Sequence, residues 1–269
     1  MSISLLHFFA IAPRGMAAHS LRVGLALLGG GAACVLLFRR RRTFHAATSA
    51  PAPLDTARLV RLSTATAVTT TDAAHAVRTS GVCVVEGAVA PNALDELKST
   101  ISTLSPRQKA NRRAHRWEHV HDPHQAPFFR LALDPLISRL VRQLLGPKTY
   151  LEKAGMIVSH PGAAAQRWHM DTPHLFASKA HLPPHSLTVF IALVAFTEEN
   201  GPTEFRLGSH EKVNLVRPQL AVPATCEKGS LVVYDTRVMH RGGPNLSQEA
   251  RPLVYLTFSR IWYRDTLNP

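Results

Sequence analysis

The chain has 269 residues, 45% of them hydrophobic and 18% charged, a composition that excludes a disordered or fibrous protein and suffices for a folded core. Lys and Arg number 31 against 18 Asp and Glu, but residues 1–54 hold six of the arginines and no acid, so the remaining 25 basic and 18 acidic residues give a formal charge of +7. Because no basic run after residue 54 resembles a nucleic-acid-binding arm, we expect an anionic small molecule, and no nucleic acid, as partner.

The N-terminal segment, residues 1–54, is expected to be a membrane anchor or a targeting segment. Residues 23–38 are uncharged and are followed directly by four arginines, 39–42. A helix of this length would span about 24 Å, short of the roughly 30 Å of a bilayer core. Two locations follow. The protein is membrane-anchored through residues 23–38 with its folded domain in the cytoplasm, or it is imported into a mitochondrion or plastid.

Residues 55–80 are predicted to be a linker, because the stretch is rich in Ala, Thr and Ser. The folded domain is then expected over residues 81–269. It begins with an apolar strand at 81–85 and an amphipathic helix at 91–104. A second helical pattern covers 131–145, where Gly146 and the proline after it predict the helix end.

From residue 150 onward the pattern changes to short apolar runs separated by turn residues. These runs cover 150–159, 186–196, 230–236 and 253–262. Helices followed by a β-rich half predict a mainly β fold with flanking helices, a sandwich or jelly roll.

The strongest chemical motif is the triplet His169-Met170-Asp171. Strand alternation places His169 and Asp171 on one side of the chain. A third ligand would come from His240, which ends the run after Gly229. If the strands on either side of the next loop pair directly, His240 and Arg251 lie at the same end of the sheet. Two histidines and a carboxylate leave open positions on an octahedral iron, and an arginine beside them could hold a dicarboxylate.

A rival histidine cluster lies at His119, His121 and His124. It falls in a polar stretch that contains a proline, between the helical segments, where exposed histidines are ordinary. Without a metal, His169 would be an ordinary turn histidine, His240 a histidine at a strand end and Arg251 a solvated arginine. No single one of these residues distinguishes a metal site from this simpler interpretation.

Several motifs together resemble the phytanoyl-CoA dioxygenase (PhyH) family of Fe(II)- and 2-oxoglutarate-dependent oxygenases over roughly residues 80–265. The motifs are the strand and helix at 81–104, His169-Met-Asp171, Glu199-Asn-Gly-Pro-Thr-Glu-Phe-Arg-Leu-Gly-Ser-His210, Lys228-Gly-Ser-Leu-Val-Val-Tyr-Asp235, and His240-Arg-Gly-Gly-Pro-Asn245 with Arg251. The resemblance implies a cupin-like double-stranded β-helix. It also implies Fe(II) as cofactor, with 2-oxoglutarate and O2 as cosubstrates.

The resemblance assigns roles to single residues. It implies that His169, Asp171 and His240 are the catalytic iron ligands and that Arg251 binds the distal carboxylate of 2-oxoglutarate. Met156 and Gln166 are similar to family positions that line the cosubstrate. The implied activity is hydroxylation of a small-molecule or lipid-like substrate with release of succinate and CO2.

Two other functions stay open at this point: a catalytically silent metal-binding protein on the same fold, and a cupin-type iron enzyme that does not use 2-oxoglutarate. The intact set of four residues argues against the first, and Arg251 argues against the second. The sequence carries no code for the substrate, which could be an acyl-CoA, a lipid, an alkaloid or another small molecule. It also does not indicate the oligomeric state.

Overall fold

The computed structural model describes residues 59–64, 70–106, 108–111, 115–176, 181–211 and 220–266. All of these residues belong to one compact unit, Pro51–Pro269. The expected anchor or targeting segment, residues 1–54, lies outside the described residues.

The location expected from the N-terminal segment is corrected by the structure. No helix among the described residues is both long enough and apolar enough to cross a membrane. The part of the chain that the structure describes therefore gives no support to the expected membrane anchoring. Residues 23–38, on which it rested, are not among those described.

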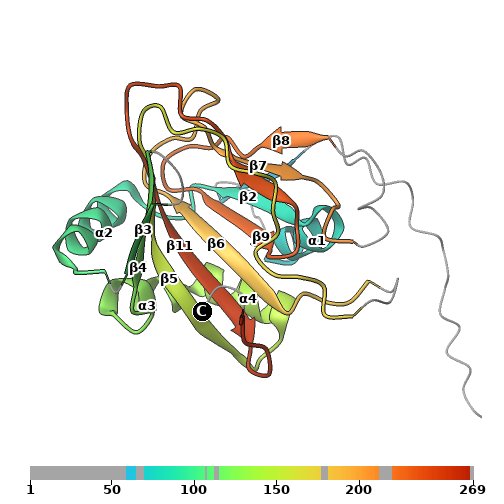
Figure 1. The fold of residues 1–269 in the computed structure, drawn as a ribbon. Coiled ribbons are helices and arrows are strands. Elements are labelled where there is room, and N and C mark those ends of the chain that lie inside the picture. The colour runs from blue at the N-terminus through green and yellow to red at the C-terminus, as the bar shows by residue number, and fades with distance from the viewer. Residues whose placement is uncertain are drawn as a thin grey trace, which may run out of the picture. The chain divides into compact units, whose positions relative to one another are not determined.

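The described part of the fold is a large sheet facing a small one, with helices on the outer side of the large sheet (Figure 1). The large sheet has eight strands in the order β1-β2-β9-β6-β11-β5-β4-β3, and the small sheet has three in the order β10-β7-β8. The elements are β1 (Val60–Ser63), α1 (Thr70–Ser80), β2 (Val82–Glu86), α2 (Pro91–Thr103), β3 (Gln108–Asn111), β4 (Arg116–His121), α3 (Ala126–Ala132), α4 (Pro135–Leu145), β5 (Thr149–Ser159), β6 (Ser186–Ala192), β7 (Thr203–Arg206), β8 (Ala221–Pro223), β9 (Leu231–Asp235), β10 (His240–Gly242) and β11 (Arg251–Arg260).

Two hydrophobic clusters cover the two faces of the large sheet. The outer cluster joins the sheet to the helices and includes Leu94, Leu140 and Leu256, each 1% exposed or less. The inner cluster lies between the two sheets and includes Phe190, Phe205 and Tyr255. This two-sheet arrangement confirms the expected mainly β, jelly-roll fold with flanking helices.

The predicted helices are present, with one difference. α2 buries Leu94, Leu97 and Ile101, as the spacing predicts. The pattern over 131–145, however, is divided between α3 and α4. Proline disfavours the helical conformation of the residue before it, so the helix is interrupted at Asp134, which precedes Pro135. The Asp134 carboxylate then caps α4 by accepting hydrogen bonds from the Leu136 and Ile137 amides.

The linker expected over residues 55–80 is not what the structure shows. β1 pairs in parallel with β2, and the following helix, α1, contacts α4 and β2. α1 is alanine-rich, and its small side chains allow it to pack closely on the sheet: Ala73, Ala74 and Ala76 are at most 2% exposed. The composition that suggested a linker is therefore that of a buried helix, and the folded unit begins before residue 81.

Candidate metal and cosubstrate site

The small sheet and the segment that precedes the large-sheet strand β6 bring the three predicted ligands together. His169 and His240 form an isolated antiparallel bridge, in which each amide donates to the other residue's carbonyl at 3.0 and 2.8 Å. Asp171 is fixed by its amide, which donates to the Thr236 carbonyl at 2.9 Å. As a result, one ligand atom from each of His169, Asp171 and His240 lies within 4.8 Å of the others.

Hydrogen bonds orient all three side chains. Nδ1 of His169 lies 2.8 Å from the Arg167 carbonyl, and Nδ1 of His240 lies 3.0 Å from the Val238 carbonyl. If each Nδ1–H donates to its carbonyl, each Nε2 presents a lone pair toward Asp171, which is the tautomer a metal ligand needs. The Tyr234 hydroxyl donates to Oδ2 of Asp171 at 2.8 Å, and Oδ1 faces the two imidazoles.

The electrostatics favour an ionised carboxylate in this group. Burial by itself would raise the pKa of Asp171, but His240, His169 and the Tyr234 hydroxyl together lower that pKa to about 2. Burial beside Asp171 raises the pKa of Tyr234, so the phenol stays protonated as a donor. The site therefore offers one carboxylate oxygen and two imidazole nitrogens, a donor set suited to iron with open positions.

The same residues line a cavity of about 180 Å³ between the sheets. Its far end is built by a row of paired residues across three strands: Arg116 on β4 and Arg251 on β11 both pair with Ser159 on β5. Directly paired residues point to the same face, so both arginines face the cavity and line it. Sequence reasoning found Arg251 and missed Arg116, for which only this pairing supplies a signal.

Both guanidinium groups are buried, and no described carboxylate forms an ion pair with either of them. Arg116 is 2% exposed and Arg251 is 1% exposed. Burial lowers the pKa of Arg116 to about 10, and burial together with the nearby Arg116 lowers the pKa of Arg251 to about 9. Since uncompensated buried charge is costly, this end of the cavity is suited to an anionic ligand.

Single atoms support the same conclusion. Nε of Arg251 donates to the Asn200 carbonyl at 3.1 Å, and Nη2 of Arg116 donates to the Gly243 carbonyl at 2.7 Å. Nη1 of Arg251 and Nε of Arg116, in contrast, are buried and have no hydrogen-bond partner among the described residues. Buried donors without a partner are rare in folded proteins, and a bound carboxylate could supply the missing acceptor.

The route by which His240 and Arg251 meet differs from the expected one. β9 and β11 do not pair, because β6 lies between them, and His240 belongs to β10 of the small sheet. The two residues approach the cavity from opposite sheets.

The two remaining predicted residues have different positions. Gln166 lines the cavity, and its side-chain oxygen accepts from the Gly242 amide at 2.8 Å. Met156 does not line it. Strand alternation turns Met156 to the outer face of β5, where it packs against the helix-side cluster, and Ile157 faces the cavity instead. Met156 is therefore withdrawn from the cosubstrate-lining residues.

The rival histidine cluster does not assemble. His121 is buried against Phe128, with ring centroids 5.1 Å apart. Within the described ranges, the only other group of potential ligands besides the triad is His181, His210 and Glu211, and Nε2 of His210 there lies 3.0 Å from the Arg78 carbonyl.

Comparisons with known proteins agree with this geometry. A sequence model of the family described as phytanoyl-CoA dioxygenase (PhyH) matches residues 77–253. The chain is 36% identical over 115 residues, 40% of its length, to dioxygenase olcK of Penicillium canescens, and 26% identical over 198 residues, 66% of its length, to dioxygenase trt7 of Aspergillus terreus. The matched parts span 38% and 69% of those relatives.

The fold is shared with a solved structure, that of EctD from S. alaskensis with 2-oxoglutarate and 5-hydroxyectoine. The TM-score is 0.61 at 18% identity, covering 73% of this chain and 78% of that one.

Proposed function

Because the chain belongs to the phytanoyl-CoA dioxygenase family of Fe(II)- and 2-oxoglutarate-dependent oxygenases, we propose that it hydroxylates a small-molecule substrate and converts 2-oxoglutarate to succinate and CO2. The family match and the His-Asp-His group support the expected enzyme class, a non-haem iron oxygenase with Fe(II), 2-oxoglutarate and O2, and the two named relatives are dioxygenases. The reaction product and the substrate are the proposed part.

One observation carries the proposal: the same cavity is lined by a His-Asp-His group and by two buried arginines that form no ion pair with any described residue. The donor set fits iron, and the buried guanidinium atoms that lack a partner fit a dicarboxylate. We propose that His169, Asp171 and His240 hold the metal. Arg251 and Arg116 would hold the distal carboxylate of the cosubstrate, and Gln166 would shape the wall beside them.

Each side chain then has a defined task. When bound, iron and 2-oxoglutarate would activate O2, so that one oxygen atom enters a C–H bond of the substrate as a hydroxyl group and the other enters succinate as CO2 is released. With Nδ1–H directed at the Arg167 and Val238 carbonyls, the two imidazoles would present Nε2 to the metal. The Tyr234 hydroxyl fixes Asp171 by donating to its Oδ2, and burial of the arginines would exclude water from the carboxylate that they bind.

The alternative functions are less well supported by these residues. A silent metal-binding protein has no use for two buried arginines at the far end of the cavity. A cupin-type enzyme without 2-oxoglutarate would leave the same charges without an acid. Halogenation is disfavoured as well, because Asp171 would fill the coordination position that a halide needs.

Metal titration of variants tests the ligand assignment. We expect His169→Ala, Asp171→Ala and His240→Ala each to lose Fe(II) binding by anaerobic calorimetry, with little loss of thermal stability because the triad lines a cavity. His121→Ala removes another histidine but should keep the metal. Retention of iron by all three triad variants, or its loss in His121→Ala, would contradict the assignment.

A further inference from the structure

The metal end of the cavity is polar, and it is formed by a second row of paired residues. Lys153 on β5 pairs with Thr257 on β11, Thr257 pairs with Thr188 on β6, and Thr188 pairs with Tyr234 on β9. All four side chains line the cavity. Tyr234 is also the donor to Asp171, so this row ends at the proposed metal.

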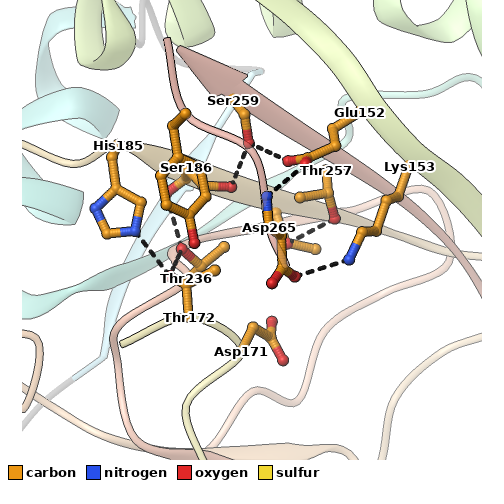
Figure 2. A network of polar contacts seen from close by, with 12 residues as sticks. Glu152, Lys153, Asp171, Thr172, His185, Ser186, Thr236, Thr257, Ser259 and Asp265 are labelled. Carbon is orange, nitrogen blue, oxygen red and sulfur yellow. Dashed lines mark hydrogen bonds and ion pairs between the residues drawn. The ribbon is translucent and has the colours of Figure 1, made fainter. Parts of the chain in front are cut away.

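The C-terminal segment adds a carboxylate to this row. Asp265 lines the cavity and forms an ion pair with Nζ of Lys153 at 2.7 Å, while its amide donates to Oε1 of Glu152 at 2.8 Å. Figure 2 shows Asp265 and Lys153 on the same side of the network as Asp171. The ion pair is therefore part of the wall around the triad.

Hydroxyl groups continue the polar wall. Oγ1 of Thr188 lies 3.0 Å from Oγ1 of Thr257. Oγ1 of Thr172 lies 2.6 Å from Oγ1 of Thr236, and both of these residues are labelled in Figure 2. Between this end and the arginine end, the lining includes the apolar or aromatic side chains of Ile157, Phe190 and Leu253, together with Glu118, which pairs with Ile157. The cavity thus has two polar ends, one at Arg116 and Arg251 and the other beside the triad.

The distribution of charge separates two classes of substrate. An alkyl chain lying beside the triad would remove water from the ion pair and the hydroxyl groups and replace none of their hydrogen bonds, which is costly. A molecule with ionised or hydroxyl groups can exchange hydrogen bonds with water for bonds to this wall at little cost. The side chains of Lys153 and Asp265 are 23% and 7% exposed, so a ligand in the cavity would cover them further.

We propose that the wall of Lys153, Asp265, Thr188 and Thr257 is the substrate-recognition site and that the substrate is a small polar molecule. It would carry amino, carboxylate or hydroxyl groups within a few atoms of the oxidised carbon, and it is not a fatty acid or fatty acyl thioester. This inference rests on the proposed function, because the polar wall selects a substrate only if the triad holds the reacting centre.

Competition binding to the full chain loaded with Zn²⁺ and 2-oxoglutarate tests the inference without turnover. The polar probes are zwitterionic amino acids, amino sugars and polyols, and the alkyl probes are hexanoate, decanoate and decanoyl-CoA, all followed by ligand-detected NMR. The test variant is Lys153→Met with Asp265→Leu, which removes both charges and so leaves neither one unpaired. The control is Lys228→Met with Asp95→Leu, which removes an ion pair of the same 2.7 Å length that does not line the cavity.

We expect at least one polar probe to bind and no alkyl probe to bind more tightly than it. The affinity of that polar probe should fall about tenfold or more in the test variant, equivalent to about 1.4 kcal/mol, and should be unchanged in the control. Lys153→Arg keeps the cation and should keep the preference, which separates recognition from a folding defect. Tighter binding of alkyl probes, no polar probe bound, or equal polar affinity in the test variant would overturn the inference.

The two proposals fail differently. If neither Zn²⁺ nor 2-oxoglutarate binds the unmodified chain, the proposed function fails. If both bind and the alkyl probes are preferred, only the inference on the substrate fails.

Discussion

At the scale of single residues, charge without a partner is the most informative feature of this protein. Arg251 is expected beside a metal from its place after His240, and the structure places it in the cavity with a buried Nη1 that lacks an acceptor. Arg116 could not be predicted, because an arginine that opens a strand is usually solvated. Only the pairing of both residues with Ser159 reveals their common face. That Met156 does not line the cavity could not be predicted for a related reason. Alternation separates the two faces of a strand but does not say which of them faces the cavity.

Replacing Arg251 by lysine should weaken 2-oxoglutarate binding far more than Fe(II) binding. Lysine keeps the charge but loses the planar pair of donors that matches a carboxylate. One lost charge-assisted hydrogen bond, about 1.5–3 kcal/mol, corresponds to a roughly 10- to 150-fold higher dissociation constant for 2-oxoglutarate. Arg251→Ala should be weaker still, and Arg139→Gln on the exposed face of α4 is the matched control. Equal affinity in wild type and Arg251→Ala, measured by calorimetry, would mean that another cation holds the carboxylate.

A buried histidine near the site should make stability depend on pH. Burial, together with the nearby Arg237, lowers the pKa of His185 to about 4. The unfolded chain therefore binds this proton first as the pH falls below about 6.5, so stability is lost progressively down to pH 4. The effect is about 3 kcal/mol. In His185→Gln, the free energy of unfolding measured by denaturant titration should fall less between pH 7 and pH 4 than in the unmodified chain, by up to that amount. The same fall in both proteins would argue against a neutral buried imidazole.

At the scale of elements, the helices and strands with a clear apolar pattern are predictable from the sequence, whereas those defined by tertiary contacts are not. The strands β6 and β9, which are buried throughout, and the helix α2, which buries one face, follow from periodicity, and so do the apolar runs of β5 and β11. The segment of α1 resembles a linker in the sequence because its alanine and threonine residues give no strong periodic pattern. Its burial arises from contact with α4 and β2, which the sequence does not reveal. The insertion of β6 between β9 and β11 is a topological fact that the sequence pattern does not contain.

A charge placed in α1 tests whether this helix belongs to the core. Ala74 is fully buried, whereas His75, the next residue, is exposed. Ala74→Asp would bury an unpaired carboxylate and should lower the free energy of unfolding by about 3–5 kcal/mol or prevent folding. His75→Asp adds the same charge to the solvent side and should change stability by at most about 0.5 kcal/mol. Equal denaturation midpoints for the two variants would restore the interpretation of this segment as a linker.

At the scale of the whole molecule, the two sheets bring a metal site, a cationic end and a polar wall into one cavity. Binding of metal and cosubstrate to the folded state alone should stabilise it. At a concentration 100 times the dissociation constant, 2-oxoglutarate should add about 2.7 kcal/mol. That corresponds to a rise in Tm of roughly 5–10 °C by calorimetry in the presence of Zn²⁺. Asp171→Ala, which removes the ligand carboxylate, should show a much smaller rise, and an equal rise would place the cosubstrate away from the triad.

The most direct test of the central claim is the release of CO2 from 2-oxoglutarate labelled at carbon 1, measured for the full chain with Fe(II) and O2. The account predicts equimolar succinate and labelled CO2, abolished in Asp171→Ala and His240→Ala and strongly reduced in Arg251→Ala at the same cosubstrate concentration. Release no greater than that of Fe(II) without protein, or equal release from Asp171→Ala and the unmodified chain, would contradict it.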